Sequence, residues 1–209
     1  LDCSRSDVIE FQKRFFLEAS LCARLSHPNI IRIYDFGCHK EEYFIAMEYL
    51  RGQTLRELLS SEGPLHPKRA INIFEQLCSA LIEAHEHGIV HRDLKCSNIM
   101  VCSHALHTDF VKLFDFGIVK KMSGDPELTV DGKILGSPNY MSPEQISGIE
   151  VDLRTDIYSL GVIFYRLLTG KLPFSDTSPM KVLMCHLKNT PPLLSKENSF
   201  VNSLESFNH

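Results

Sequence analysis

The sequence lacks the features that mark several classes of protein. Its 209 residues contain no block of basic residues, and the formal net charge is −4. A nucleic-acid partner or attachment to an anionic membrane surface is therefore not expected. The longest apolar run, near residues 157–168, is interrupted by Tyr158, Ser159 and Arg166. It is too short to span a bilayer, and no signal peptide opens the chain.

The cysteines, glycines and prolines exclude further classes of protein. The seven cysteines are scattered and odd in number, which disfavours a zinc site or a disulfide framework. This pattern is typical of a reducing cytosol, so a cytoplasmic location is expected, although the full-length protein could be tethered to a membrane. Eleven glycines and ten prolines exclude a low-complexity chain. With 44% hydrophobic and 23% charged residues, the composition favours a globular protein with a substantial core.

The spacing of apolar residues predicts the order of the elements. Steps of three and four residues predict a helix over 7–26, which His27 and Pro28 end. Runs of β-branched and aromatic residues predict a hairpin of two strands over 30–36 and 43–49. The remaining chain predicts further helices over 54–60, 67–87, 156–168 and 180–187, with short strands over 99–102 and 110–114.

The apolar faces of the predicted helices indicate a fold class. Helix 156–168 is apolar nearly all round and is expected to be buried. Residues 118–142 show little periodicity, and loops of this length in a compact domain are usually functional. The order of elements favours an α+β fold with a strand-rich front and a helical back. The stripe of helix 67–87 is predicted from Ile71, Phe74, Leu77, Cys78 and Leu81.

Two short motifs carry the strongest functional signal. Residues 91–98 read His-Arg-Asp-Leu-Lys-Cys-Ser-Asn, and residues 115–117 read Asp-Phe-Gly. This pair resembles the catalytic loop and the metal-binding motif of eukaryotic-type (Hanks-type) serine/threonine protein kinases. The resemblance implies a bilobal fold, with a partial N-lobe over 1–50 and a mostly helical C-lobe over 51–209. The alternative without catalytic function is a helix-ending loop with two ordinary surface acids.

The resemblance also implies catalytic roles and cofactors. Asp93 would accept the proton of the incoming hydroxyl, and Lys95 would neutralise charge on the moving phosphoryl group. Asn98 and Asp115 would supply oxygen ligands to Mg²⁺, a hard cation that prefers oxygen. ATP and Mg²⁺ are therefore the expected cofactors, and proteins carrying serine or threonine are the expected substrates.

A third motif indicates the kind of phosphoacceptor. Residues 136–144 read Gly-Ser-Pro-Asn-Tyr-Met-Ser-Pro-Glu and resemble the end of a kinase activation segment, which seats the protein substrate. Lys95 together with Ser137 is the pattern of serine/threonine kinases. Glu144 closes the motif. Small-molecule phosphotransferases lack this segment, so it argues against that class. A proline-bounded loop without function is the alternative.

Other residues match supporting positions of the family. Arg92 would read a phosphate on the activation segment, with Ser123 and Thr129 as candidate sites. Arg92 as a purely structural donor remains an equal alternative. Asp156, at the start of a central helix, would hold the backbone of the catalytic loop. Support is also expected from His91, Phe116 and Gly117.

The nucleotide pocket is implied by five residues. Glu18 lies on the apolar face of its helix and needs a cation partner, which in the family is a strand lysine that holds the ATP phosphates. Met47 matches the gatekeeper, and Glu48 and Leu50 would offer backbone groups to adenine. Met100 would pack beneath the adenine ring. A partly exposed helix acid and plain core methionines are the alternatives.

The resemblance is incomplete at both ends. No Gly-rich loop or strand lysine precedes Glu18, and the later helices of the family do not follow residue 207. The chain starts with Leu1, which fits a fragment of an active kinase whose activity alone would be absent or weak. A short natural pseudokinase that acts as a protein-binding module is the second hypothesis, and a small-molecule kinase is the third. The run 154–163 resembles bacterial members of the family.

Overall fold

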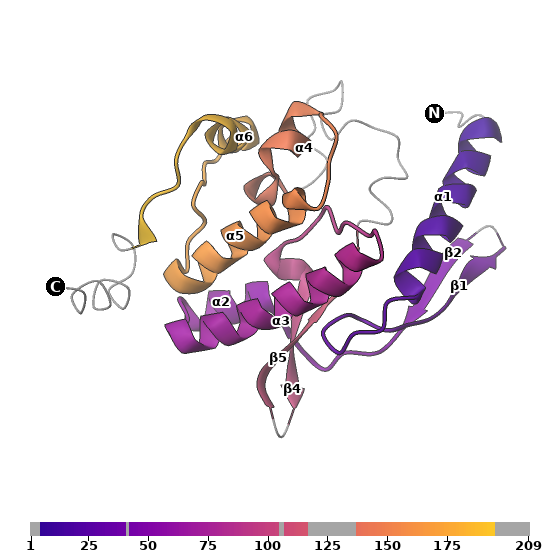
Figure 1. The fold of residues 1–209 in the computed structure, drawn as a ribbon, viewed down its shortest axis with the longest axis horizontal. Coiled ribbons are helices and arrows are strands. Elements are labelled where there is room, and N and C mark those ends of the chain that lie inside the picture. Colours follow the sequence, from indigo (N-terminus) through magenta and orange to yellow (C-terminus); the bar gives the residue numbers. More distant parts are fainter. Residues whose placement is uncertain (1–4, 41, 105–106, 117–136, 195–209) are drawn as a thin grey trace.

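The computed structural model describes residues 5–40, 42–104, 107–116 and 137–194, and Figure 1 shows their arrangement. A front region, residues 5–50, holds one helix and a β-hairpin, and a back region, from residue 51 onward, holds the other elements. The front elements are α1 (Arg5–Ala23), β1 (Ile33–His39) and β2 (Glu42–Met47). The back elements are β3 (Gly52–Thr54), α2 (Leu55–Glu62), α3 (Pro67–Glu86), η1 (Cys96–Asn98), β4 (Ile99–His104), β5 (His107–Leu113), η3 (Pro138–Tyr140), α4 (Pro143–Ser147), α5 (Arg154–Thr169) and α6 (Pro179–Lys188).

The front region is a helix lying on a two-stranded antiparallel hairpin. The strands pair from Ile33 opposite Met47 to His39 opposite Glu42. Phe15 of α1 is buried, and its ring lies 5.1 Å from the ring of Tyr43 on β2. Aromatic pairs of this kind add to the burial of apolar area and hold the helix on the hairpin.

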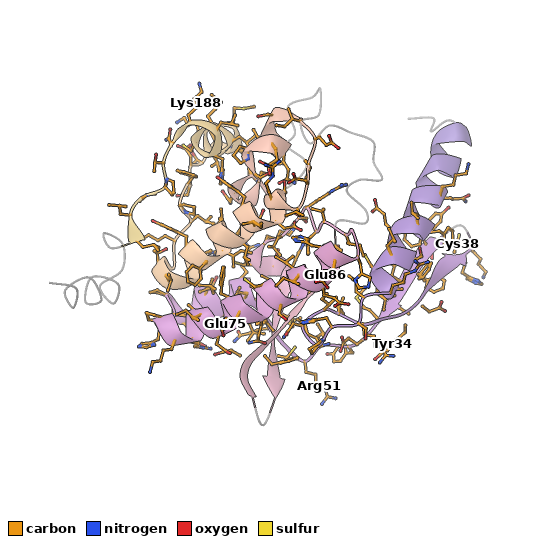
Figure 2. The ribbon with its side chains drawn as sticks, in the orientation of Figure 1. Tyr34, Cys38, Arg51, Glu75, Glu86 and Lys188 are labelled. Carbon is orange, nitrogen blue, oxygen red and sulfur yellow. The ribbon has the colours of Figure 1, made fainter. Side chains whose placement is uncertain are left out.

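The back region is built around α3 and α5, which pack against each other in Figure 1. The buried side of α3 is formed by Ile73, Leu77, Leu81 and small alanines. Helix α2 begins with a capping box: Thr54 accepts from the Glu57 amide, and the Glu57 carboxylate accepts from the Thr54 amide. Figure 2 shows that Glu75 and Glu86 lie on the outside of α3.

A small antiparallel sheet, in the order β3-β4-β5, lies beside α3 and carries the loops of the site. Strand β3 can pair this closely because residue 52 is glycine. A Cβ atom at Gly52 would lie 2.1 Å from the Val101 carbonyl oxygen, a distance that no side chain tolerates. Strand β3 thereby brings the chain from the front region directly against β4.

The two regions are joined along the end of β5. The Ile31 amide donates to the Leu113 carbonyl at 2.9 Å, and the Leu113 amide donates to the Asn29 carbonyl at 2.8 Å. The ammonium of Lys112 on β5 lies 2.5 Å from the carboxylate of Glu48. Both groups are largely shielded from water, so this ion pair ties the end of the hairpin to the sheet.

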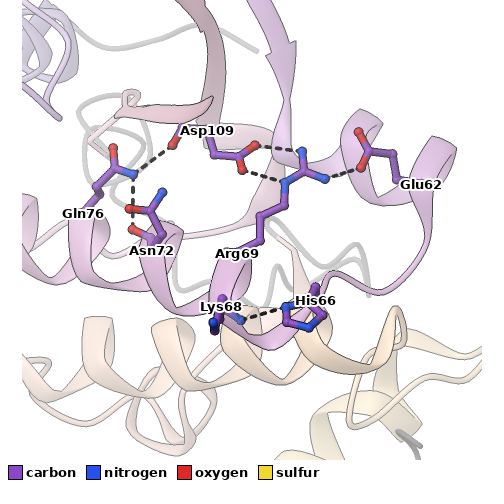
Figure 3. Close-up of polar contacts among 7 residues, drawn as sticks. All are labelled: Glu62, His66, Lys68, Arg69, Asn72, Gln76 and Asp109. Carbon is purple, nitrogen blue, oxygen red and sulfur yellow. Dashed lines mark hydrogen bonds and ion pairs between the residues drawn. The ribbon is translucent and has the colours of Figure 1, made fainter. Parts of the chain in front are cut away.

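Polar side chains also tie α3 to the sheet, as Figure 3 shows. Arg69 donates to both carboxylate oxygens of Asp109, at 2.6 and 2.8 Å, and pairs with Glu62 of α2. Gln76 donates to the Asp109 carbonyl at 2.8 Å and accepts from the Val111 amide at 3.0 Å. A two-pronged guanidinium–carboxylate bond fixes direction as well as distance. The network therefore sets how β5 lies along α3.

The structure confirms the predicted helices and strands and corrects several details. Ile71, predicted to lie in the buried stripe of α3, is 45% exposed. Helix α5, predicted to be buried all round, leaves Ile157 56% exposed. Strand β3 and helix α4 were not predicted, because three and five residues are too few for a periodic signal. Within the described ranges, no helix is both long and apolar enough to cross a membrane.

Candidate active site

The loop after α3 is held by one buried carboxylate. Asp156, in the first turn of α5, is completely buried. It accepts from the backbone amides of His91 and Arg92 at 2.8 and 2.9 Å. His85 of α3 approaches the same carboxylate at 2.8 Å. A buried carboxylate is stable only when its oxygens are satisfied, and here three donors satisfy them. Asp156 thus has the supporting geometry that the sequence predicts.

His91 links the loop to the segment that ends β5. Burial lowers the pKa of His91, so the ring is neutral near pH 7. Nδ1 accepts from the Asp93 amide at 3.3 Å, which leaves Nε2 as the donor to the Phe114 carbonyl at 3.2 Å. The ring also lies 4.7 Å from the ring of Phe116. His91 and Phe116 therefore hold the two motif segments together.

The three side chains predicted to be catalytic lie together. Asp93 is nearly buried, and its Oδ2 accepts from the Lys95 ammonium at 2.7 Å. Asn98 Nδ2 donates to the Asp93 carbonyl at 3.0 Å. This bond assigns Nδ2 as the inward atom, so Oδ1, which receives a 3.5 Å contact from Ser97 Oγ, is the atom available to a cation.

Asp115 is exposed and lies just after β5, next to the buried Phe116. Its backbone φ is 60°, and that of Arg92 is 63°. Residues with a Cβ atom adopt this left-handed conformation at a cost, and such residues cluster at functional sites. Two of the four such residues in the described part of the chain thus lie at the site, and the other two, Lys40 and Asp109, lie elsewhere.

The segment 137–145 packs against the same loop. Gln145 Nε2 donates to the Arg92 carbonyl at 2.8 Å. Thr155 of α5 accepts a bond from Ser142 Oγ at 3.1 Å and donates to Glu144 at 2.7 Å. Partial burial raises the pKa of Glu144, but hydrogen bonds from Thr155, its own backbone and Ser142 outweigh it and hold the pKa below its usual value. Glu144 is thus an anion whose position is fixed by hydrogen bonds.

A small pocket lies between this segment and the loop. Its lining includes Asp93 and Arg92 from the loop, with Ser137, Tyr140 and Met141 from the segment. Ser137 is partly exposed, and Ser159 of α5 donates to the Tyr140 carbonyl at 2.7 Å. The pocket therefore places the Asp93 carboxylate, a hydrogen-bond acceptor, near Ser137 and Tyr140, which carry hydroxyl groups.

A larger pocket lies on the other side of His91, beneath α1. Glu18, Leu21 and Cys22 of α1 line it together with His91 and Phe116. Glu18 is partly buried there. Its carboxylate and the burial of Cys22 raise the pKa of that thiol to about 12, with burial as the larger cause, so Cys22 is an unreactive thiol. The structure thus brings Glu18 close to both motif segments.

The residues predicted for the nucleotide pocket lie where the two regions join. Met47, at the end of β2, is 45% exposed, so it is not a core methionine in this structure. The Glu48 side chain is taken up by Lys112 and by the Arg32 amide, at 2.5 and 2.7 Å, and its own amide donates to the Arg32 carbonyl at 2.9 Å. Leu50 and Met100 are partly buried.

Comparison with known proteins gives the family. The model of the protein kinase domain matches residues 3–205 of the 209. The chain belongs to the protein kinase family. It is 42% identical over 192 residues to the serine/threonine-protein kinase PrkC of Bacillus subtilis, covering 92% of this chain and 29% of that protein. It is 47% identical over 183 residues to the serine/threonine-protein kinase pkn3 of Myxococcus xanthus, covering 86% of this chain and 34% of that protein.

A solved kinase structure confirms the fold. The crystal structure of Rad53 residues 1–466 in complex with AMP-PNP matches with a TM-score of 0.69 and 28% identity, covering 82% of this chain and 42% of that chain. Membership of a family of bacterial serine/threonine kinases and an α+β kinase fold were both predicted, and both predictions are confirmed. The chain spans about a third of the length of the two curated relatives.

The structure does not describe every residue that the sequence predicts for the site. Gly117, Ser123 and Thr129 lie outside the described residues. Conversely, sequence reasoning missed the supporting hydroxyl of Thr155 and the amide of Gln145. Thr155 directly precedes Asp156, and Gln145 follows the Pro-Glu pair, so both sit beside motifs, but only packing shows what they contact.

Proposed function

We propose that this kinase domain transfers the γ-phosphoryl group of ATP to serine and threonine hydroxyls of proteins. The observation that carries the proposal is the Asp93 carboxylate at the small pocket, with Lys95 bound to it and Asn98 bound to the Asp93 backbone carbonyl. Phosphoryl transfer needs positioning and charge neutralisation more than covalent chemistry from the protein. A fixed carboxylate beside a fixed ammonium supplies both.

Asp93 acts as the residue that orients the incoming hydroxyl and accepts its proton. The carboxylate lines the pocket that Ser137 and Tyr140 border, which is the proposed entry of the phosphoacceptor side chain. Lys95, 2.7 Å from Asp93 Oδ2, brings positive charge to the place where the transferred group develops negative charge. Ser137 lines the same pocket from the segment 137–145.

The residues present fit Mg²⁺ together with ATP. Asn98 offers a neutral amide oxygen, and Asp115 offers an exposed carboxylate. Within the described residues, no three His, Cys, Asp or Glu side chains form a metal-binding group. Such sparse ligation suits Mg²⁺, which keeps waters and binds through one or two carboxylates plus substrate phosphates. When bound, Mg²⁺ neutralises phosphate charge.

The adenine and the phosphates are assigned to the junction of the two regions. Glu48 and Leu50 would bind adenine through their backbone, Met47 would border the pocket, and Met100 on β4 would form its floor. Glu18, beside the pocket under α1, is proposed to hold the family's phosphate-binding lysine by an ion pair.

Arg92 and the segment around Ser123 and Thr129 are proposed as a phosphorylation-dependent part of the site. Arg92 Nε is buried without a hydrogen-bond partner among the described residues. An arginine in that state is suited to receive an anion such as a phosphorylated side chain. Glu144 stays a structural anion of the activation segment because Thr155 already binds it.

The decisive experiment measures transfer of γ-³²P from ATP to a mixed set of serine, threonine and tyrosine peptides by the native protein that contains this chain. We expect labelling of serine and threonine peptides that depends on Mg²⁺. Asp93→Asn should reduce kcat by at least about 100-fold, the usual contribution of a positioned acid–base residue. Asp176→Asn, a change at an exposed carboxylate far along the chain, is the matched control and should keep the rate.

Three results would contradict the proposal. Labelling of tyrosine peptides alone would assign the wrong phosphoacceptor. Labelling of a small-molecule alcohol with no peptide labelled would assign the wrong substrate class. Binding of ATP with no transfer to any acceptor would favour the protein-binding module instead.

A further inference from the structure

Arg166 is a charged residue in an unusual place. It lies in the last turn of α5, where the other side chains are buried and mostly apolar. Its Nη1 donates to the Tyr140 hydroxyl at 2.6 Å. Its Nε is buried and has no hydrogen-bond partner among the described residues. The side chain is partly exposed, so part of the guanidinium reaches water.

No carboxylate neutralises this guanidinium within the described part of the chain. The groups that act on its charge there are the Tyr140 hydroxyl and the Cys96 thiol. Burial raises the pKa of both of these groups, so both are neutral near pH 7. By contrast, Arg69 is paired with two carboxylates and Arg154 with one. A buried guanidinium N–H without a hydrogen-bond partner is costly, and a bound anion would satisfy it.

The cation lies next to the phosphoacceptor pocket. Tyr140, its hydrogen-bond partner, lines that pocket together with Asp93 and Ser137. Cys96, whose thiol interacts electrostatically with Arg166, is the third residue after Asp93 in the same loop. An anion that reaches Arg166 from solvent must therefore lie close to the peptide that presents its hydroxyl to Asp93.

We propose that Arg166 is a specificity-determining residue that binds a carboxylate side chain of the protein substrate, close in sequence to the phosphorylated serine or threonine. The inference rests on the proposed function, because it names the substrate class for that same site. The planar guanidinium matches a carboxylate, and the apolar wall of α5 strengthens the pairing by excluding water. Substrates with aspartate or glutamate beside the acceptor are therefore favoured over neutral ones.

The test compares matched peptides with the native protein. A threonine peptide carries a single aspartate, placed in turn at each position from four before to four after the threonine, and each peptide has a partner with asparagine there. The ratio of kcat/KM within a pair cancels effects of a variant on folding or on the chemical step. We expect a ratio of about ten or more at one or two positions, the size of one charge-assisted hydrogen bond.

Variants of Arg166 assign that ratio to the residue. Arg166→Gln removes the charge and keeps a donor for Tyr140, and the ratio should fall to about one. Arg166→Lys should keep part of the preference, and Arg166→Glu should favour a lysine peptide instead. Arg154→Gln, at the exposed start of the same helix, is the matched control and should leave the ratio unchanged.

The outcomes separate this inference from the proposed function. An asparagine peptide labelled by the wild type and not by Asp93→Asn supports the kinase activity whatever the ratio is. A ratio near one in the wild type, or the same ratio in Arg166→Gln, would overturn the role of Arg166. If no peptide is labelled, the proposed function fails. Dissociation constants of the same peptides, from fluorescence anisotropy, then give the ratio that decides on Arg166.

Discussion

The front and back regions of this domain bury their apolar side chains to very different degrees. On α1 and the hairpin, Phe16, Tyr34 and Phe44 are 39%, 66% and 43% exposed. In the back region, Ile73 and Leu77 of α3 are fully buried, and so is Ile163 of α5. Burial of apolar area is the main stabilising contribution to folding, so the back region carries most of the stability.

The same contrast holds for polar groups. The loop in the back region is fixed by a buried carboxylate and by bonds from two helices, whereas the front region meets the back through a narrow set of contacts along β5. Regions with few buried contacts open locally at low free-energy cost. The loop that carries Asp93 thus belongs to the more firmly bonded part of the domain, and four measurements can test this contrast.

The largest effect is expected from the buried carboxylate of α5. Asp156→Ala removes the acceptor of two loop amides and leaves them unsatisfied in the core, together with His85. We expect a loss of about 3–5 kcal/mol in the free energy of unfolding, measured by urea denaturation. Glu150→Ala, at an exposed carboxylate shortly before the same helix, should leave the midpoint almost unchanged. A native-like midpoint for Asp156→Ala would show that the loop is held otherwise.

A pair of truncations on α3 tests the burial of the back region directly. Leu77→Ala creates a cavity at a fully buried position and should cost about 2–5 kcal/mol. Ile71→Ala removes a similar side chain from a 45% exposed position of the same helix and should cost within about 0.5 kcal/mol. Thermal unfolding of the two variants gives the comparison. Equal losses would contradict the orientation of α3.

The network of Figure 3 is expected to contribute less. Arg69→Met breaks a two-pronged bond to Asp109, which is largely buried, and should cost about 1–2 kcal/mol. Arg154→Met breaks an exposed pair, and its effect should be too small to measure at physiological salt. Chemical denaturation at low and high salt separates the two. If high salt removed the whole difference in stability between Arg69→Met and the wild type, the Arg69–Asp109 pair would have to be exposed to solvent.

The smallest effect is a pH dependence from buried histidines. Burial lowers the pKa of His91 and His186 below the unfolded value of 6.5. Between the two pKa values the unfolded chain binds more protons, so stability falls as pH drops below 6.5 and is retained above it. Each histidine contributes a slope of at most about 1.4 kcal/mol per pH unit. Urea midpoints from pH 7.5 to 5.5 should fall, and His186→Gln should make that fall shallower. An unchanged slope would show that His186 does not titrate differently on folding.

The sequence predicts the helices and the motif residues well, for a physical reason. Residues 91–98 carry the loop chemistry in one continuous stretch, and the long helices have an apolar period that shows in any window. Asp93, Lys95 and Asn98 are within five residues of each other, so the backbone alone brings them together. Identity of the motif residues was therefore enough to predict their neighbourhood.

Contacts between distant residues could not be predicted in the same way. Arg69 and Asp109 are 40 residues apart, and Tyr140 and Arg166 are 26 apart. Nothing in the sequence distinguishes these pairs from other charged or polar residues, because the contact depends on how α3, α5 and the sheet pack. The exposure of Ile71 was missed for a related reason: the packing of α3 sets its buried face along Ala70, Ile73 and Leu77, and Ile71 lies beside that face.

Asp156 holds the catalytic loop by the backbone amides of His91 and Arg92, and this has a consequence for how the enzyme can change over generations. Every amino acid except proline has that amide, so the clamp itself does not select the side chain at position 92, although the φ of 63° there disfavours β-branched residues. The shape of the loop is thus inherited separately from its chemistry. Residue 92 can therefore change over generations while the loop that carries Asp93 keeps its shape.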